Sequence, residues 1–196
     1  MASERDARLD ALLDKQDISE CLARFSRGMD RFDRAIYLSA FHEDAEVAAG
    51  PFVGTAADCW NWAVPVHRSG QILTHHTLLQ STIDLDGDTA HAETYYQFVG
   101  RNLDESLWIA GGRYLDRFER RAGEWRIALR TNLIEWAHTP LRMAVPFEDI
   151  PDVALNGVSS RDPADPSYRR PLVNRRLPNN PADGLQQLIQ SNKAQF

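Results

Sequence analysis

The sequence predicts an α+β fold: a cone-shaped, curved antiparallel sheet (an α+β barrel) wrapped around N-terminal helices, with a proline-rich C-terminal extension. Three observations predict it. Apolar residues near the N-terminus recur at helical spacing, whereas residues after Gln71 form long segments rich in β-branched and aromatic residues. Helices that precede a run of strands, without alternating with them, are typical of α+β domains. We expect one domain over residues 1–140 and an extension over residues 141–196, which packs on the same or a neighbouring subunit.

The organising element is the stretch from Lys15 to Asp33, KQDISECLARFSRGMDRFD. Its apolar residues follow three- and four-residue steps and form one stripe of an amphipathic helix: Ile18, Cys21, Leu22, Phe25 and Met29. Asp30 follows at the C-terminal end, where the helix dipole disfavours a negative charge. Either Asp30 faces solvent, or a cationic group elsewhere in the chain holds it.

Shorter elements surround this helix. Ser3 and Asp6 resemble a helix cap, and the helix that begins there either continues into this stretch or kinks and restarts before it. We expect a second short helix over residues 33–41, a short strand over residues 45–49, and a helix over residues 54–68 that is interrupted near Pro65, because proline breaks the helical hydrogen-bond pattern.

Four strands should then form the sheet, over residues 72–85, 89–101, 106–120 and 124–137. Turn signals separate them, and Asp86-Gly87-Asp88 is typical of a tight hairpin because Gly tolerates positive φ. A meander of this kind, curved around the N-terminal helices, leaves a pocket between its concave face and the helix.

The C-terminal extension contains many prolines, which break up any long element, although a short helix is possible over residues 185–191. Its apolar residues need a surface to cover, so we expect a homo-oligomer. These residues are Leu172, Val173, Leu177, Leu185, Leu188 and Ile189.

Composition excludes several classes of protein. The net charge of −6 argues against nucleic-acid binding, which needs a basic face. Cys21 and Cys59 give neither a disulfide framework nor zinc-site spacing, and nucleotide-binding and metal motifs are missing, so we expect no cofactor and no metal. No apolar run reaches the ~20 residues that span a bilayer. The first residues are charged, unlike a secretory signal, so we expect a cytoplasmic protein without membrane contact.

Three polar features suggest chemistry. Asp30 is the first, and the second is the pair His75-His76 in an otherwise apolar strand. Strand neighbours point to opposite faces, so only one histidine of the pair can enter the pocket, and parity alone cannot choose between them. Arg130 is the third: a guanidinium in the middle of a half-buried strand needs a carboxylate or an anionic ligand.

Each feature also has a structural explanation, since strand histidines are commonly core residues and strand arginines commonly reach outward. Together, however, a carboxylate that orients an imidazole makes a general base. Several aromatic side chains are available to line a pocket for a flat or hydrophobic ligand: Trp60, Trp62, Tyr95, Tyr96, Trp108, Tyr114 and Trp136.

Roughly residues 9–140 resemble the SnoaL-like branch of the nuclear transport factor 2-like superfamily. The motifs are LLDKQDISECLARFSRGMDRFD with LSAFHEDAEV, THHTLLQSTIDLDGDTAHAE, and GGRYLDRFERRAGEWRIALRTNLIEW. Within this superfamily the chain is similar to the cofactor-free lyases scytalone dehydratase, bile-acid 7α-dehydratase and hexachlorocyclohexane dehydrochlorinase. The resemblance implies a homotrimer and elimination of water, halide or formaldehyde from a hydrophobic cyclic or aromatic substrate.

The resemblance also implies site residues. The family aspartate matches Asp30, the family histidine matches His76 rather than His75, and the arginine of the last strand matches Arg130. Substrate would contact Phe25, Trp60, Gln80, Tyr96, Trp108, Asn132 and Trp136. The chain departs from the pattern at Phe25, where relatives have Tyr or Lys, and at Gln80, where Asn is frequent. The alternative hypotheses are a ligand-binding protein that keeps the three groups as a structural network, and a noncatalytic scaffold.

Overall fold

The computed structural model describes residues 4–139, 155, 160–169, 171, 173 and 175. The chain divides into two compact units, one of Met1–Ala144 with Ser160–Ala164 and one of Val145–Ser159 with Asp165–Phe196. In the second unit a short 3-10 helix, η2, spans Pro166–Tyr168. The expected cap residue Ser3, the helix over residues 185–191 and most of the apolar tail residues lie outside the described residues.

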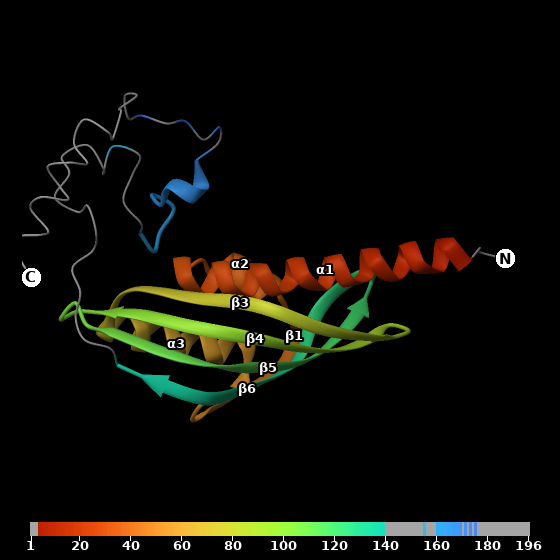
Figure 1. Cartoon of the computed structure of the whole chain (residues 1–196), viewed down its shortest axis with the longest axis horizontal. Coiled ribbons are helices and arrows are strands. Elements are labelled where there is room, and N and C mark those ends of the chain that lie inside the picture. The colour runs from red at the N-terminus through yellow and green to blue at the C-terminus, as the bar shows by residue number, and fades with distance from the viewer. Residues whose placement is uncertain are drawn as a thin grey trace, which may run out of the picture. The chain divides into compact units, whose positions relative to one another are not determined.

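The N-terminal part is one uninterrupted helix, α1 (Glu4–Arg31), followed by the short helix α2 (Arg34–Ser39) (Figure 1). The whole predicted apolar stripe of α1 is buried, which confirms the predicted face. Asp33 starts α2 by accepting a hydrogen bond from the Ile36 backbone at 3.0 Å. α1 and α2 approach closely at Gly28, where a Cβ would lie 2.4 Å from the Tyr37 backbone nitrogen.

The sheet contains β1 (Phe41–Ala49), β2 (Phe52–Thr55), β3 (Gln71–Asp86), β4 (Thr89–Asn102), β5 (Leu107–Arg121) and β6 (Glu124–His138). Their order is β2-β1-β6-β5-β4-β3, and the sheet is not closed. The four long strands pair antiparallel as predicted, but β1 pairs parallel with β6, so the sheet is mixed. A wholly antiparallel sheet is therefore wrong for β1, which reaches β6 only after the chain has crossed through α3 and the meander.

The turns at Asp86-Gly87-Asp88 and at Ala122-Gly123 form between the strands that they were expected to separate. Gly87 has φ 60°, and Asp86 pairs with Thr89 across the turn. Ala122 and Gly123 also have positive φ, at 53° and 83°. Turn chemistry therefore explains why the ends of the four long strands agree with prediction to about one residue.

The segment between β1 and β3 differs from prediction. β1 starts at Phe41, which was expected to end a helix, and β2 was not anticipated. The following helix, α3, spans Ala56–Gly70 with Thr55 as its N-cap, and it continues through Pro65 without interruption. Pro65 and Asn61, whose carbonyl loses its helical partner, are both exposed, so water can satisfy that carbonyl.

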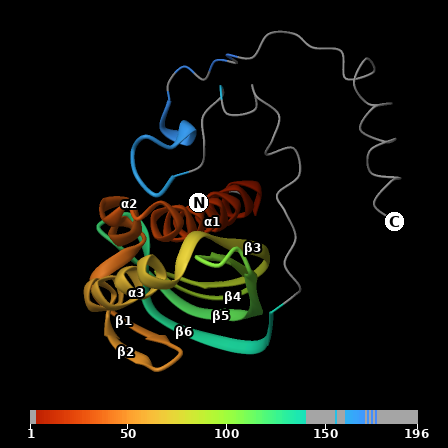
Figure 2. The ribbon, with the colours of Figure 1, turned by 90° about the vertical axis from the view of Figure 1, so that its left-hand side faces the viewer.

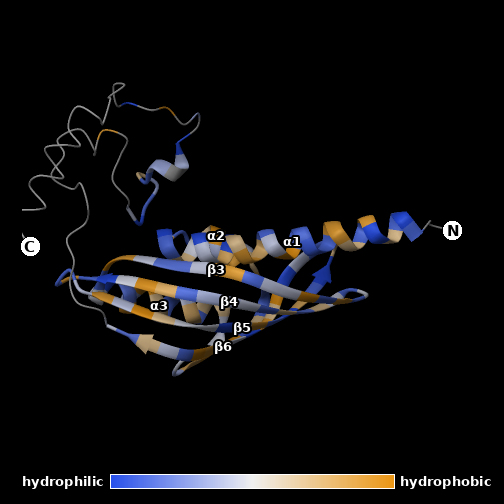
Figure 3. Cartoon of the chain, in the orientation of Figure 1, coloured by the Kyte–Doolittle hydropathy of each residue, from blue (hydrophilic) through white to orange (hydrophobic). Residues whose placement is uncertain are grey.

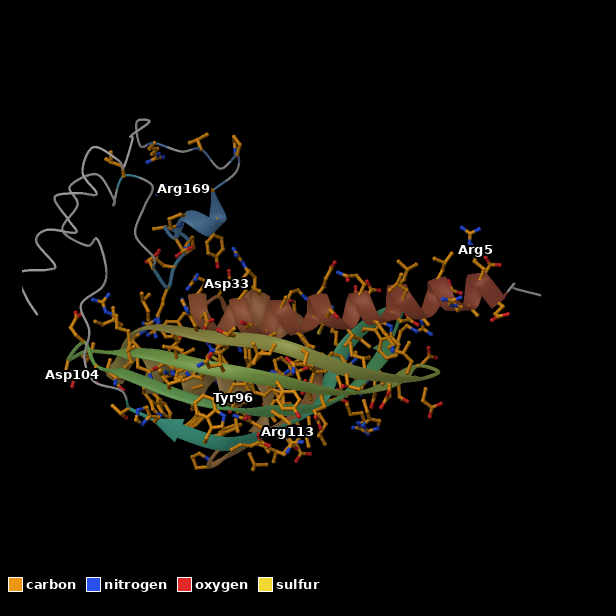
Figure 4. The ribbon with its side chains drawn as sticks, viewed as in Figure 1. Arg5, Asp33, Tyr96, Asp104, Arg113 and Arg169 are labelled. Atoms are coloured by element: carbon orange, nitrogen blue, oxygen red, sulfur yellow. The ribbon has the colours of Figure 1, made fainter. Side chains whose placement is uncertain are left out.

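The core lies on the concave face of the sheet. In the end view the strands curve beneath α1, and α3 lies at the side near β1 (Figure 2). Polar and apolar residues alternate along the strands (Figure 3), and on β4 the even-numbered residues from Ala90 to Gly100 are buried. Tyr96 and Arg113 come from the middle of neighbouring strands (Figure 4), but Tyr96 is buried whereas Arg113 pairs with Glu93 and Glu135. Among the described residues no helix is apolar and long enough to cross a membrane.

Candidate functional site

Asp30, the penultimate residue of α1, is held by β3. Its Oδ1 accepts hydrogen bonds from Thr74 Oγ1 at 3.0 Å and from His76 Nδ1 at 2.6 Å, and its Oδ2 accepts one from the His76 backbone nitrogen at 2.9 Å. Asp30 is only 7% exposed. Burial alone would raise the pKa of this carboxyl, but the charge and hydrogen bonds of His76, together with Thr74, lower it below its usual value. Asp30 is therefore a buried carboxylate, stabilised at an otherwise unfavourable helix end.

His76 is oriented by this contact. A carboxylate can only accept, so Nδ1 carries the proton and Nε2 keeps its lone pair. Ser26 Oγ donates to the His76 carbonyl at 2.6 Å, which ties α1 to the strand a second time. The ring packs against Phe25 and Phe98, with centroids 6.0 and 4.9 Å away. His76 faces inward and His75 is exposed, so the predicted register is confirmed.

Arg130 on β6 is paired with Asp116 on β5. Nε and Nη2 of the guanidinium each donate to one Asp116 oxygen at 2.7 Å, and the two side chains are 2% and 0% exposed. Burial would lower the pKa of Arg130, but Asp116 raises it, so the guanidinium stays charged. Of the two partners that the sequence left open, the structure contains the carboxylate. The sequence did not single out Asp116, although it lies two residues after Tyr114, on the same inward face of β5.

One edge of Arg130 remains unused. Nη1 is buried and has no hydrogen-bond partner among the described residues. The guanidinium lies over the rings of Phe25 and Tyr114, with its carbon 3.9 and 4.2 Å from their centroids. Stacking on aromatic faces compensates part of the cost of burying the charge. The unpaired N–H donor is therefore available to an acceptor in the adjoining cavity.

A cavity of about 200 Å³ opens beside these groups, between the concave face, α1 and α3. Apolar and aromatic side chains dominate its wall, as is typical of a small-molecule site. Of the residues predicted from the sequence, the wall contains Phe25, Trp62, His76, Tyr96, Trp108, Tyr114, Arg130 and Asn132. Asp30 lies behind His76 and is not part of the wall.

Three predicted contact residues lie elsewhere. Trp60 is a core residue whose ring packs against Tyr37, with centroids 5.1 Å apart. Gln80 is exposed because the β3–β4 register shifts between Leu78 and Ser81, which breaks the parity that linked it to His76. Trp136 is 47% exposed and lies over Gly111, where a second register shift interrupts the β5–β6 pairing. Counting residues by twos could not foresee these bulges.

The sequence interpretation missed His67, which lines the cavity from α3. Its Nδ1 lies 2.7 Å from Gln71 Oε1, and its ring is edge-on to His76 with centroids 5.7 Å apart. Burial and the neighbouring His76 lower the pKa of His67 to about 4. The helical steps Trp60, Ala63, Val64 and His67 could have revealed it, but the expected break at Pro65 removed that signal.

Arg161 was also missed. It belongs to Ser160–Ala164, which is part of the same compact unit as the sheet. Its Nη1 donates to the backbone carbonyls of His67 and Gln71 at 3.3 and 2.9 Å, so it binds the C-terminal end of α3. Burial lowers the pKa of Arg161 to about 10, although Asp30 acts in the opposite direction. Within the part of the chain that the structure describes, no group of three or more His, Cys, Asp or Glu residues could hold a metal ion.

The comparisons with known proteins agree with this architecture. The sequence model of the SnoaL-like domain matches residues 10–131, whereas no match was found among curated protein sequences. A type 2 hexachlorocyclohexane dehydrochlorinase (LinA) superposes with a TM-score of 0.65 at 17% identity, covering 71% of this chain and 98% of its own. A candidate scytalone dehydratase from Novosphingobium aromaticivorans gives 0.59 at 21%, covering 70% and 95%. Rv3472 from Mycobacterium tuberculosis, of unknown function, gives 0.57 at 22%, covering 74% and 89%.

Proposed function

Since the chain belongs to the SnoaL-like domain family, we propose that it is a cofactor-independent lyase that eliminates water, halide or formaldehyde from a hydrophobic cyclic or aromatic compound. The observation that carries the proposal is the 2.6 Å contact between Asp30 and His76 at the wall of an apolar cavity. The similarity to a dehydrochlorinase supports the reaction class, although at 17% identity it establishes the fold alone.

In this proposal His76 Nε2 is the general base. It removes a proton from a carbon next to the leaving group, while Asp30 keeps the proton of the imidazole on Nδ1 and stabilises the imidazolium that forms. For loss of water or halide, the electron pair of the broken C–H bond forms the new double bond, and the leaving group departs with the electrons of its own bond. For loss of formaldehyde, His76 would instead take the hydroxyl proton of a hydroxymethyl group, the C–C bond would break to release formaldehyde, and its electron pair would form the double bond as a hydroxide departs from the next carbon. The proton on His76 then passes to the departing hydroxide or to solvent.

Arg130 would assist departure of the leaving group. Its free Nη1–H can donate a hydrogen bond to a halide or oxygen as negative charge develops there. Asp116 already compensates the full charge of the guanidinium. The site therefore suits an uncharged acceptor that becomes partly negative in the transition state better than a substrate that carries a full negative charge.

The test is a panel of aromatic and cyclic compounds with an acidic C–H beside a hydroxyl, halide or hydroxymethyl group, followed by ultraviolet absorbance of the product alkene. Loss of the base should cost roughly 10²–10⁴-fold in rate, so His76→Ala should fall by at least the lower figure. Asp30→Asn should also lower the rate severely.

The matched control is His75→Ala, which removes an exposed imidazole from the same strand. It should keep the wild-type rate, and circular dichroism should report all variants as folded. A His76→Ala protein that converts its substrate at the wild-type rate would refute the proposed mechanism, because another group would then have to act as the base.

A further inference from the structure

The cavity contains two imidazoles of different chemical character. His76 has a carboxylate behind it, which stabilises a protonated ring. His67 has the neutral amide of Gln71 behind it, whose hydrogen bond raises the pKa of His67 by less than burial and the neighbouring His76 lower it. Both rings line the same space, nearly perpendicular at an interplanar angle of 86°. One histidine is therefore suited to take up a proton, and the other is suited to remain neutral.

The contact with Gln71 fixes which nitrogen of His67 carries the proton. Amide oxygen Oε1 only accepts hydrogen bonds, so Nδ1 must donate and Nε2 must keep its lone pair. Burial favours the neutral ring, since it lowers the pKa of His67 to about 4. At neutral pH His67 therefore presents a hydrogen-bond acceptor.

Other residues hold this pair in place. Gln71 is buried, and Gly100 on β4 makes room for its amide, because a Cβ there would lie 2.3 Å from Gln71 Nε2. Arg161 binds the backbone carbonyls of both His67 and Gln71. Three separate segments therefore position one neutral acceptor, which is more support than a residue that only fills space would need.

The polar groups of the wall indicate what a ligand must offer. The Asn132 side chain hydrogen-bonds to Tyr96, but its Oδ1 is a second acceptor that is buried without a partner among the described residues, and Arg130 Nη1 is the corresponding unpaired donor. An unpaired buried acceptor is unfavourable, and a ligand O–H group can satisfy it. A pure hydrocarbon or halocarbon cannot donate such a hydrogen bond.

We propose that His67 is a specificity residue that accepts a hydrogen bond from a hydroxyl group of the ligand, so that the cavity selects hydroxylated aromatic or cyclic compounds. This inference names the substrate class of the proposed lyase and uses the same cavity. It makes His67 a binding group and leaves proton abstraction to His76. It does not require turnover, so it can be tested separately from the proposed reaction.

The probes are 2-naphthol and 2-methoxynaphthalene, which share a ring system but differ in the O–H donor. Fluorescence titration near neutral pH gives a dissociation constant for each. The full-length protein should prefer 2-naphthol by about tenfold, the value of one hydrogen bond that otherwise leaves a buried acceptor unpaired. In His67→Phe the preference should vanish, while 2-methoxynaphthalene keeps its affinity.

His67→Leu serves as the second variant if the Phe side chain is too large for the wall. Gln71→Leu should weaken the preference for 2-naphthol, because the proton of His67 would no longer be held on Nδ1. His75→Phe is the control and should behave as the wild type does. The inference is overturned if the wild type does not discriminate or does not bind 2-naphthol, or if His67→Phe and His67→Leu retain the preference. Loss of the preference in His76→Ala alone would overturn it too, because the hydroxyl would then bind His76.

Discussion

The buried pair of Arg130 and Asp116 allows a prediction about stability. Replacing Arg130 by Met removes both hydrogen bonds from a carboxylate whose side chain is fully buried. Breaking a buried ion pair from one side costs about 3–5 kcal/mol, because the remaining charge has neither partner nor water. Domains of this size are stable by about 5–15 kcal/mol, so the single variant should lose about a fifth or more of its stability.

The double variant Arg130→Met/Asp116→Leu removes both charges. Replacing a buried pair by apolar side chains of similar volume is commonly neutral or stabilising by about 1–4 kcal/mol. The introduced methionine side chain would still fill the space against the rings of Phe25 and Tyr114, although without the cation–π contacts that Arg130 makes there. We therefore expect the double variant to be far more stable than either single variant.

Urea unfolding followed by tryptophan fluorescence measures these differences, because Trp125 and Trp60 are buried in the same core. A loss of less than about 1 kcal/mol in Arg130→Met would refute the reasoning, since it would mean that water or another cation reaches Asp116. The double variant also separates the two roles of Arg130. If it folds but does not turn over the substrate, the free Nη1–H acts on the leaving group as proposed.

Two further predictions concern pH and assembly. The pKa of His67 is lowered from 6.5 to about 4, so on acidification the unfolded chain takes up a proton before the folded protein does, and stability should fall. Between about pH 7 and about pH 5, the lowered pKa of His67 should reduce the free energy of unfolding by about 2 kcal/mol. Urea midpoints at both pH values should show that His67→Leu loses this contribution, and an unchanged pH dependence would contradict it. Light scattering should report a homo-oligomer, because the described residues expose Leu79, Tyr95 and Trp136; the resemblance to the lyases leads us to expect a trimer, and a monomer mass would contradict the prediction.

Periodicity and turn chemistry predicted most of the fold. The stripe of α1 and the Asp-Gly turn act locally, so their signals stand in the sequence itself. The parallel pairing of β1 with β6 joins segments about eighty residues apart, and no local pattern specifies such a partner. α3 was partly mispredicted because the rule for Pro65 ignores whether the freed carbonyl faces water.

The site was predicted unevenly for a related reason. Asp30 was placed by its position on the helix and His76 by its position on the strand, and the two side chains meet as the pattern predicted. Gln80 lies within a bulge and Trp136 follows one, and a single extra residue reverses the face of everything that follows. Asp116 and His67 are defined by what they contact, and such contacts arise only when the elements pack together.

Two buried carboxylates lie near the cavity, and they differ in what their partners can do. The pair of Asp30 and His76 suits the proposed proton transfer, whereas the pair of Asp116 and Arg130 suits a structural role. Asp30 and Asp116 both accept hydrogen bonds from a cationic or potentially cationic partner. Arg130 is always protonated, so its pair is fixed in charge and can only hold geometry and donate a hydrogen bond. His76 can exist with or without its second proton, and Asp30 stabilises the protonated form without leaving its position on α1. In the proposed reaction we therefore expect proton transfer to pass through His76, while Arg130 contributes a constant field beside it.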